Sequence, residues 1–243
     1  MTFPSGSFPL DGVSLDDPVL DGPRLRPRSG GAPDALVVLL HGYGADGRDL
    51  IDIGNAWADL LPGALFVSPH APDPCEGAPV GRQWFPLTFR DPHELTRGAE
   101  GAAPLLRDFL AEELAKYDLP PERLALVGFS QGAMMALKLA TTAQVAPAAV
   151  VAYSGMWVDV TQGQGETSRG DVELPSRPPI LLVHGSEDEV IPASALFASA
   201  RGLAAAGVPV EWHLSQGLGH GIDDEGLFHG GQFLAEFLGK GRR

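Results

Sequence analysis

The sequence holds a serine whose surroundings are typical of a catalytic nucleophile. Ser130 is the central residue of a Gly-x-Ser-x-Gly motif, residues 128–132. The motif follows an apolar run typical of a strand and precedes an apolar run typical of a helix. A sharp strand-to-helix turn holds such a serine in a strained conformation, and the N–H groups at the helix start can bind an oxyanion. We therefore predict a nucleophile at Ser130; the alternative is a serine that only caps its helix.

A serine hydroxyl needs a base to remove its proton, and His220 is the histidine best placed to act as that base. It lies in the glycine-rich residues 216–221, between the last expected strand and the last expected helix. We expect this loop to carry the imidazole over the end of the sheet; a surface histidine is the alternative. His213 and His229 are expected to be solvated or structural. Three more histidines follow expected strands and could reach the same edge: His41, His70 and His184. Two of them, His41 and His184, open His-Gly turns and are expected to bond to loop backbone.

The base in turn needs an orienting carboxylate, and three consecutive acids follow the penultimate expected strand: Glu187, Asp188 and Glu189. Such a run is usually a solvated helix start that the helix dipole favours, but one of these acids could reach the base. Spacing does not choose among the three, and position favours Asp188. The resulting chain order of serine, acid and histidine is that of an α/β-hydrolase.

A second donor to the oxyanion would come from a loop after an earlier strand. Residues 40–47, Leu-His-Gly-Tyr-Gly-Ala-Asp-Gly, follow the first buried strand, and their glycines permit an N–H group to point into the site. An ordinary glycine-rich turn is the alternative. Phosphate binding is not expected, because no Gly-Lys-Ser/Thr follows and no dinucleotide fingerprint is present. Taken with the serine, acid and histidine, this loop predicts acyl-ester chemistry.

The elements that must position these residues alternate between strands and helices. Continuous apolar runs predict strands buried on both faces at 35–40, 65–67, 124–127, 148–152 and 180–183. Residues 208–214 alternate instead, with Val210, Trp212 and Leu214 on one side and Glu211 and His213 on the other, as in an edge strand. Helices are predicted at 49–61, 105–117, 131–142, 192–206 and 225–238, with Pro192 in a first turn. This alternation predicts an α/β fold with a mostly parallel sheet covered on both faces.

The chain divides into an N-terminal arm and one catalytic domain. Residues 1–33 are rich in Pro, Gly, Ser and Asp, and we expect an extended arm with room for one or two edge strands. Residues 34–243 are expected to form a single α/β-hydrolase domain without a large cap. Two longer irregular stretches are expected at 71–93 and 156–178, and such loops are usually functional or mobile.

Composition narrows the function classes. The 243 residues include 17 basic and 31 acidic ones, a formal charge of −14, so nucleic acid and membrane surfaces are not expected partners. No run approaches the ~20 apolar residues of a spanning helix. The lone cysteine, Cys75, excludes an internal disulfide and a multi-thiolate metal site. With no secretion signal pattern, we expect a cytoplasmic enzyme. The high glycine content is partly assigned to tight turns of the site, at Gly42, Gly44, Gly128, Gly132, Gly219 and Gly221.

Several motifs, spread from about residue 34 to the C-terminus, resemble those of the phospholipase/carboxylesterase group of α/β-hydrolases, which includes the acyl-protein thioesterases. They are LHGYG at 40–44, PHAP at 69–72, RQWF at 82–85, GFSQGA at 128–133, His-Gly through Asp to Val-Ile-Pro at 184–192, and Gly-His at 219–220. The resemblance implies a triad of Ser130, Asp188 and His220, and it thereby selects Asp188 among the three candidate acids. It also implies an oxyanion hole from the N–H groups of Tyr43 and Gln131, and no metal or organic cofactor.

The segment around Trp84 resembles the loop that lines the acyl site in this family. Four side chains are candidate acyl contacts, and each could equally be core or loop packing: Trp84, Phe85, Leu87 and Met134. The chain departs from the family at Pro86, where an acid is common, and in the long polar stretch 156–178. The expected partner is a small-molecule ester, with acyl preference and homodimer formation left open. The alternatives are a dienelactone-hydrolase-like or peptidase-like enzyme, or a non-catalytic binding module of the same fold.

Overall fold

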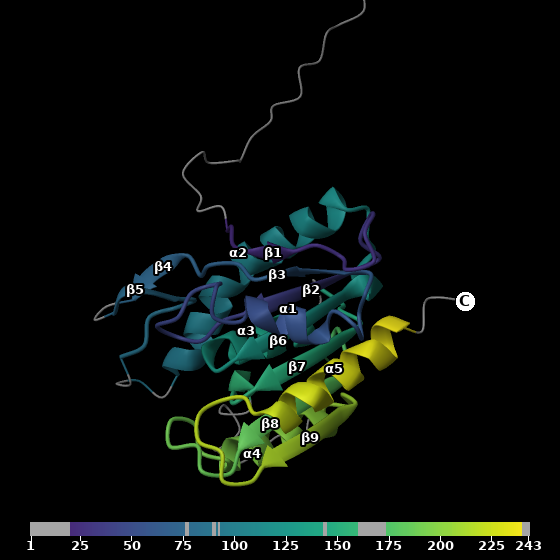
Figure 1. The fold of residues 1–243 in the computed structure, drawn as a ribbon. Coiled ribbons are helices and arrows are strands. Elements are labelled where there is room, and N and C mark those ends of the chain that lie inside the picture. Colours follow the sequence, from purple (N-terminus) through teal and green to yellow (C-terminus); the bar gives the residue numbers. More distant parts are fainter. Residues whose placement is uncertain are drawn as a thin grey trace, which may run out of the picture.

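The computed structural model describes residues 20–75, 78–88, 91, 93–142, 145–159 and 174–239. Its strands are β1 (Arg24–Leu25), β2 (Ala35–Leu40), β3 (Ala64–Val67), β4 (Asp73–Cys75), β5 (Ala78–Gln83), β6 (Leu124–Phe129), β7 (Ala149–Tyr153), β8 (Ile180–Gly185) and β9 (Val210–Ser215). Seven of them form one sheet in the order β1-β3-β2-β6-β7-β8-β9, and β4 and β5 form a separate hairpin (Figure 1). In the large sheet only β1 is antiparallel to its neighbour, β3. The mostly parallel sheet expected from the sequence is confirmed.

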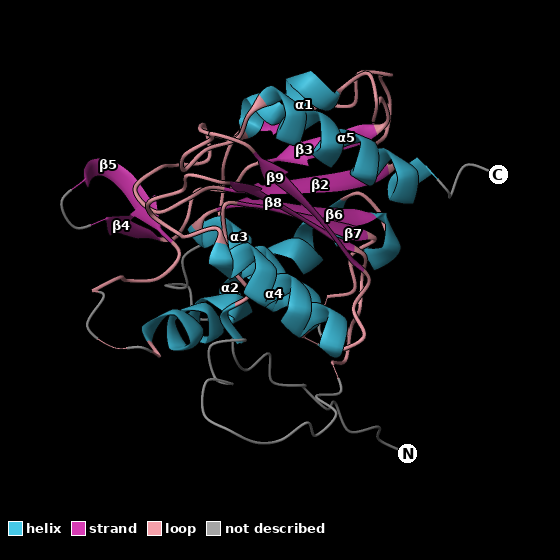
Figure 2. Cartoon of the chain, turned by 90° about the horizontal axis from the view of Figure 1, so that it is seen from below, coloured by secondary structure: helices cyan, strands magenta, loops and turns pink. Residues whose placement is uncertain are grey.

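Helices cover both faces of the sheet. They are α1 (Ile51–Trp57), α2 (Glu94–Lys116), α3 (Gln131–Thr141), α4 (Ser194–Ala205) and α5 (Asp224–Gly239), with a short 3-10 turn at Pro121–Arg123. Figure 2 shows α1 and α5 on one face and α2, α3 and α4 on the other. None of these described helices is both long and apolar enough to cross a membrane.

The central strands are apolar throughout because each of their faces packs against helices. In β2, Leu36, Val38 and Leu40 join the core beneath α2, α3 and α4. The alternate residues, including Val37 and Leu39, join the core beneath α1 and α5. Every residue of β2 is buried. A strand with two buried faces reads as a continuous apolar run, which is the pattern that predicted it.

Helix α2 begins at Glu94, so the prediction that it begins at residue 105 was wrong. Its first half contains Pro104 and two glycines, which are unfavourable inside a helix. Contacts to the rest of the protein hold this half in place. The Thr96 hydroxyl donates to the Val158 carbonyl at 3.0 Å, and Thr96 is buried. Tertiary contacts therefore outweigh the weak local propensity.

Two further local predictions were wrong. The stretch 71–93, expected to be irregular, contains the β4–β5 hairpin. Two main-chain hydrogen bonds of Arg82 hold the hairpin against the loop after β2. The Arg82 carbonyl accepts the Gly44 N–H at 2.9 Å, and the Arg82 main-chain N–H donates to the Ala45 carbonyl at 2.8 Å. Pro192 precedes α4 by two residues instead of lying in its first turn, and its carbonyl accepts the N–H of Ala195.

Candidate active site

Ser130 occupies a strained turn between β6 and α3. β6 ends at Phe129 and α3 begins at Gln131, so a single residue connects them. Its backbone has φ 53° and ψ −116°, a conformation that costs a non-glycine residue about 1–3 kcal/mol. The Ser130 N–H donates to the Tyr153 carbonyl at 2.9 Å, and the Ser130 carbonyl accepts the Met134 N–H at 3.2 Å. The turn therefore has the strained geometry that the motif predicts.

Glycines around Ser130 allow the close approach of β6, α3 and the facing loop. A Cβ at Gly132 would lie 1.9 Å from the Leu40 carbonyl oxygen, and a Cβ at Gly128 would lie 2.3 Å from the Gly132 carbonyl oxygen. At Gly42 a Cβ would lie 3.3 Å from the Cβ of Ser130. A side chain at position 128 or 132 would force strand and helix apart, which explains why the motif has glycine at both places.

Asp188 and His220 are hydrogen-bonded to each other. The distance from His220 Nδ1 to Asp188 Oδ2 is 2.8 Å. The other oxygen of Asp188 accepts the N–H groups of Val190 at 2.9 Å and Ile191 at 2.8 Å. Because a carboxylate can only accept, Nδ1 of His220 carries the proton of this hydrogen bond, and Nε2 keeps its lone pair. His220 thus has the tautomer that a base requires.

Burial distinguishes Asp188 from the acids beside it. The Asp188 side chain is buried, whereas Glu187 and Glu189 are exposed. Burial alone would raise the pKa of Asp188, but the hydrogen bonds from His220, Ile191 and Val190 outweigh it and lower that pKa below its ordinary value of 3.8. The carboxylate is therefore charged at neutral pH, as stabilisation of an imidazolium requires.

A second histidine lies against the same carboxylate. His184, at the end of β8, is 1% exposed. Its Nε2 donates to the Ile191 carbonyl at 2.7 Å and lies 3.3 Å from Asp188 Oδ2. The sequence predicted only that this histidine bonds to loop backbone. Its packing against Asp188 depends on how the chain turns after β8, which no local pattern indicates.

The loop of residues 216–223, which carries the predicted base, is fastened to the ends of β7 and β8. The Glu187 N–H donates to the Leu218 carbonyl at 2.9 Å. The Ser154 hydroxyl, directly after β7, donates to the Gly221 carbonyl at 3.2 Å. Ser154 is fully buried and has φ 44°. Sequence reasoning missed this serine, because no motif surrounds it.

The glycines that shape this loop differ from those expected. Gly219 and Gly221 have no left-handed φ, and a Cβ at either would meet nothing closer than 3.9 Å, so neither position requires glycine. Gly217 has φ 73° and makes the turn. At Gly185, in β8, a Cβ would lie 2.2 Å from the Gly219 carbonyl oxygen. The close approach therefore depends on the glycine in the strand.

The ring of Phe129 connects the turn of Ser130 to the predicted base, His220. Its centroid lies 4.8 Å from that of His220, with the two planes inclined at 47°. Phe129 directly precedes Ser130, so this contact brings the turn after β6 and the loop after β9 together. The strands are parallel, and the segments that hold Ser130, Asp188 and His220 all follow strands at the same edge of the sheet (Figure 1).

The predicted oxyanion donors lie on two segments that the structure brings together. Tyr43, which is 38% exposed, follows β2, and Gln131 is the first residue of α3, where N–H groups have no intrahelical acceptor. Gly44 has φ 82° and turns the loop after Tyr43. Below the loop, His41 is fully buried and donates from Nδ1 to the Gly42 carbonyl at 2.8 Å. Burial lowers the pKa of His41, so it stays neutral while it supports the loop.

The side chain of Gln131 has a second task that the sequence did not indicate. Its Oε1 accepts the N–H of Trp84 at 2.9 Å, and its Nε2 donates to the carbonyl of Phe85 at 2.8 Å. The indole of Trp84 donates to the His41 carbonyl at 2.9 Å. The segment after β5 is thereby held against the start of α3 and the loop after β2, which carry the two predicted oxyanion donors. Only the three-dimensional position of the hairpin could reveal this.

The four predicted acyl contacts lie in or beside the larger core. Trp84, Phe85 and Met134 are buried, at 2%, 3% and 5% exposure, and Leu87 is partly buried against them. Gln131 hydrogen-bonds to Trp84 and Phe85, and the Met134 N–H donates to the Ser130 carbonyl, so these three lie close to the turn of Ser130. Contact with an acyl chain stays a prediction.

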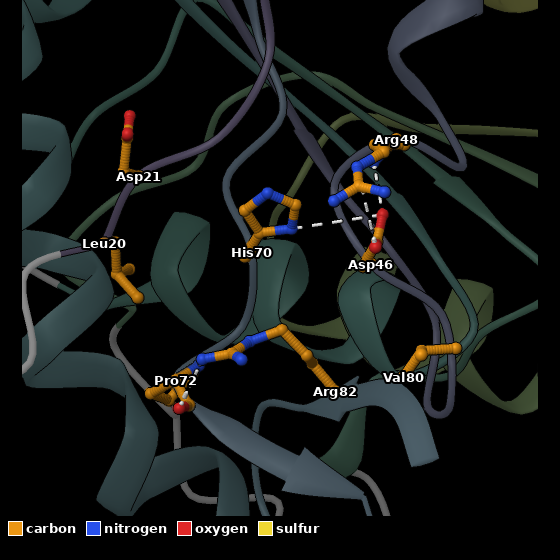
Figure 3. Close-up of a pocket in the computed structure, with 8 residues that line it drawn as sticks. All are labelled: Leu20, Asp21, Asp46, Arg48, His70, Pro72, Val80 and Arg82. Carbon is orange, nitrogen blue, oxygen red and sulfur yellow. Dashed lines mark hydrogen bonds and ion pairs between the residues drawn. The ribbon is translucent and has the colours of Figure 1, made fainter. Parts of the chain in front are cut away.

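A surface cavity of about 460 Å³ lies next to the loop after β2 but not at the predicted triad (Figure 3). Its walls are largely polar, with Asp46, His70 and Arg82 among the lining residues, and Figure 3 shows the His70 ring facing Asp46, whose Oδ1 lies 3.9 Å from His70 Nδ1. The Nδ1 of His70 accepts the Gly47 N–H at 3.1 Å. This histidine, which also follows a strand, therefore has a structural partner away from the triad.

Comparison with known proteins identifies the family. A profile of the phospholipase/carboxylesterase family matches residues 28–238, nearly the whole described chain. The chain belongs to this family. Esterase YpfH of Escherichia coli K12 is 29% identical over 203 residues, which cover 84% of this chain and 81% of that protein. Acyl-protein thioesterase 1 of Gibberella zeae is 25% identical over 223 residues, covering 84% and 91% of the two chains.

Solved structures place the chain in the same family. The crystal structure of esterase PE8 superposes with a TM-score of 0.82 at 43% identity and covers 90% of this chain and 99% of that one. Zea mays acyl-protein thioesterase 2 has a TM-score of 0.64 at 25% identity, covering 88% and 97%. The α/β-hydrolase fold expected from the sequence is thus confirmed, and the described residues contain no large cap. The protein is an enzyme of a carboxylesterase family.

Proposed function

We propose that this phospholipase/carboxylesterase family member hydrolyses carboxylic esters through a Ser-His-Asp triad and an acyl-enzyme intermediate. The observation that carries the proposal is the 2.8 Å hydrogen bond between His220 Nδ1 and the buried carboxylate of Asp188. It lies at the same sheet edge as the strained turn of Ser130. The names of the relatives, esterase and acyl-protein thioesterase, support an ester or a thioester as the substrate class, and the family's description as phospholipase/carboxylesterase keeps a lysophospholipid among the candidates.

In the acylation step, His220 Nε2 takes the hydroxyl proton of Ser130 while Oγ attacks the carbonyl carbon of the ester. Asp188 holds the imidazole in the required tautomer and stabilises its charged form. The N–H groups of Tyr43 and Gln131 bind the oxyanion, each worth roughly 3–4 kcal/mol of barrier. The tetrahedral intermediate then collapses, and the leaving alcohol or thiol takes the proton from His220.

In the deacylation step, His220 removes a proton from water, and the resulting hydroxide attacks the acyl-enzyme carbonyl. The second tetrahedral intermediate releases the carboxylic acid, and the Ser130 oxygen recovers its proton from His220. The same two N–H groups serve both intermediates, because each intermediate carries its negative charge on the former carbonyl oxygen. Each cycle leaves the enzyme unchanged.

Labelling tests the nucleophile directly. A fluorophosphonate probe should attach to Ser130 in the wild type, and Ser130→Ala should remove both labelling and ester hydrolysis, with a loss of at least about 10³-fold in kcat. Ser29→Ala is the matched control, since Ser29 is exposed and lies in the segment before β2. Wild-type protein that resists the probe, or a Ser130→Ala variant with normal esterase activity, would disprove the proposal.

A substrate panel refines the proposed class. Chromogenic esters and matched thioesters of increasing acyl length, compared by kcat/KM, separate a short-chain esterase from a long-chain thioesterase. If Trp84, Phe85, Leu87 and Met134 line the acyl site, Leu87→Ala should change the chain-length preference most cleanly. Leu87 is the partly buried member of the four, so its truncation should disturb the core least.

A further inference from the structure

Three potential metal ligands meet between β9 and α5, outside the predicted triad. His213 is on β9, and Glu225 and His229 are one turn apart on α5. One ligand atom from each lies within 4.8 Å of the other two. The distance to a Glu225 oxygen is 4.0 Å from His213 Nε2 and 4.0 Å from His229 Nε2. These side chains converge from two elements on one point.

The nitrogen of His213 that faces this point lacks a hydrogen-bond partner. His213 Nε2 is buried, and it has no partner among the described residues. Buried polar atoms in native proteins are nearly always satisfied, so an unsatisfied one points to a bound water or an ion. The ring centroids of His213 and His229 are 4.6 Å apart with the planes inclined at 40°, so the two imidazoles are in contact, and their ligand atoms lie within 4.8 Å of each other.

We propose that His213, Glu225 and His229 bind a divalent transition-metal ion, with Zn²⁺ as the preferred ion. Imidazole nitrogen and carboxylate oxygen are typical zinc ligands, and water would complete a fourfold shell. Mg²⁺ and Ca²⁺ prefer sites made of oxygen, so they fit poorly. With bonds of about 2.0–2.1 Å, tetrahedral ligand atoms lie roughly 3.4 Å apart, so each side chain needs to move by less than about 1 Å.

The surroundings favour a cation and give it access. Glu225 and His229 have side chains that are 67% and 43% exposed, so an ion can reach them from solvent. His229 also lines an open surface cavity of about 470 Å³, whose walls include Glu211 and Glu236. Within a chain of charge −14, these two acids make the local potential negative and attract a cation.

The position of the ion gives it a structural consequence. β9 ends at Ser215 and α5 begins at Asp224, so the ligands belong to the two elements on either side of the loop 216–223. A bound ion would join both ends of the loop that carries His220. Metal binding itself does not depend on the proposed function, whereas the effect on the base does. The ion is therefore a clamp on this loop and takes no part in the reaction.

Equilibrium dialysis of the tag-free protein against Zn²⁺ tests the site. The wild type should bind one equivalent, and His213→Ala and His229→Ala should each weaken binding by about 100-fold. Glu225→Gln keeps the shape and should weaken binding by about tenfold. His93→Ala, which removes an exposed histidine at the start of α2, should leave binding unchanged, and Mg²⁺ should not compete.

Two results would overturn the proposal. The metal site is wrong if the wild type takes up no stoichiometric zinc, or if the ligand variants bind it as tightly as His93→Ala does. The clamp is wrong if zinc binds but hydrogen exchange of the amides in 216–223 is as fast with zinc as without it. Thermal unfolding of the metal-free variants shows that each is folded, and none of these readouts requires esterase activity.

Discussion

The side chain of Gln131 accepts the main-chain N–H of Trp84 at 2.9 Å, so the residue after the predicted nucleophile also fixes the loop after β5. The main-chain N–H of the same residue is a predicted oxyanion donor. Its side-chain amide also donates to the Phe85 carbonyl. The predicted acyl-site loop and the predicted oxyanion hole are thereby coupled through the side-chain amide of Gln131, a residue that is 1% exposed.

Gln131→Ala should lower both stability and activity. The substitution keeps the N–H of residue 131 but leaves the N–H of Trp84 and the carbonyl of Phe85 buried without partners, which costs about 1–3 kcal/mol per group. Urea unfolding should show the loss, and kcat/KM should fall because the loop is released. Gln131→Glu retains an acceptor for Trp84 but places a buried carboxylate against the Phe85 carbonyl, so its loss of stability should shrink as the pH falls and the carboxyl becomes protonated. Equal unfolding free energies for wild type and Gln131→Ala would contradict the coupling.

Ser130→Gly should be more stable than Ser130→Ala, although both should be inactive. Alanine keeps the strain of φ 53°, whereas glycine adopts this conformation at little cost. Relief of about 1–3 kcal/mol of strain exceeds the entropy cost of an added glycine, so we expect a net difference of about 1 kcal/mol. Denaturant unfolding of the two variants measures it. If Ser130→Ala is equally stable, the turn stores no strain.

Asp188→Asn should reduce activity and change the pH dependence of stability. Asparagine cannot stabilise the imidazolium, and its amide disfavours the required tautomer, so kcat should fall by roughly 10³–10⁴-fold. In the wild type the folded pKa of Asp188 lies below its ordinary value of 3.8, so its contribution to stability is present above about pH 4 and is lost as the pH falls through the folded pKa. The difference in unfolding free energy between wild type and variant should therefore narrow as the pH falls below about 4. A difference independent of pH would show that this carboxylate is not stabilised by the fold.

The buried strands were predictable because their physics is local. A run such as residues 35–40 can be apolar throughout only where both faces of a strand are buried, and the structure confirms this for β2. The alternation of β9 was predicted in part: Val210 and Leu214 pack on the core shared with α4 and Trp212 contacts Phe197 of α4, but Trp212 is 52% exposed at this edge strand. The motif around Ser130 likewise predicts its turn, because the glycines it contains are the ones the turn requires.

Other features depend on distant contacts, so no sequence window contains them. The first turns of α2, which begins at Glu94, are held by the hydrogen bond from Thr96 to the Val158 carbonyl, 62 residues further along the chain. The bond between Gln131 and Trp84 spans 47 residues and needs the hairpin in place. The choice of Asp188 over its neighbours follows from the turn that buries it, whereas spacing left three acids open. Sequence therefore predicts the elements better than their mutual contacts.

Two glycines of α2 should respond oppositely to alanine. A Cβ at Gly98 would lie 2.3 Å from Cδ2 and 2.6 Å from Cγ of Phe85, whereas a Cβ at Gly101 would meet nothing within 4 Å. Gly98→Ala should therefore destabilise the protein by about 1–3 kcal/mol through overpacking and should lower kcat/KM, because Phe85 and Trp84 must shift. Gly101→Ala should raise stability by about 0.5–1 kcal/mol through helix propensity alone and leave activity unchanged. Urea unfolding and ester kinetics on the pair measure both effects, and a stabilised Gly98→Ala variant would show that the segment after β5 does not pack on α2 in this way.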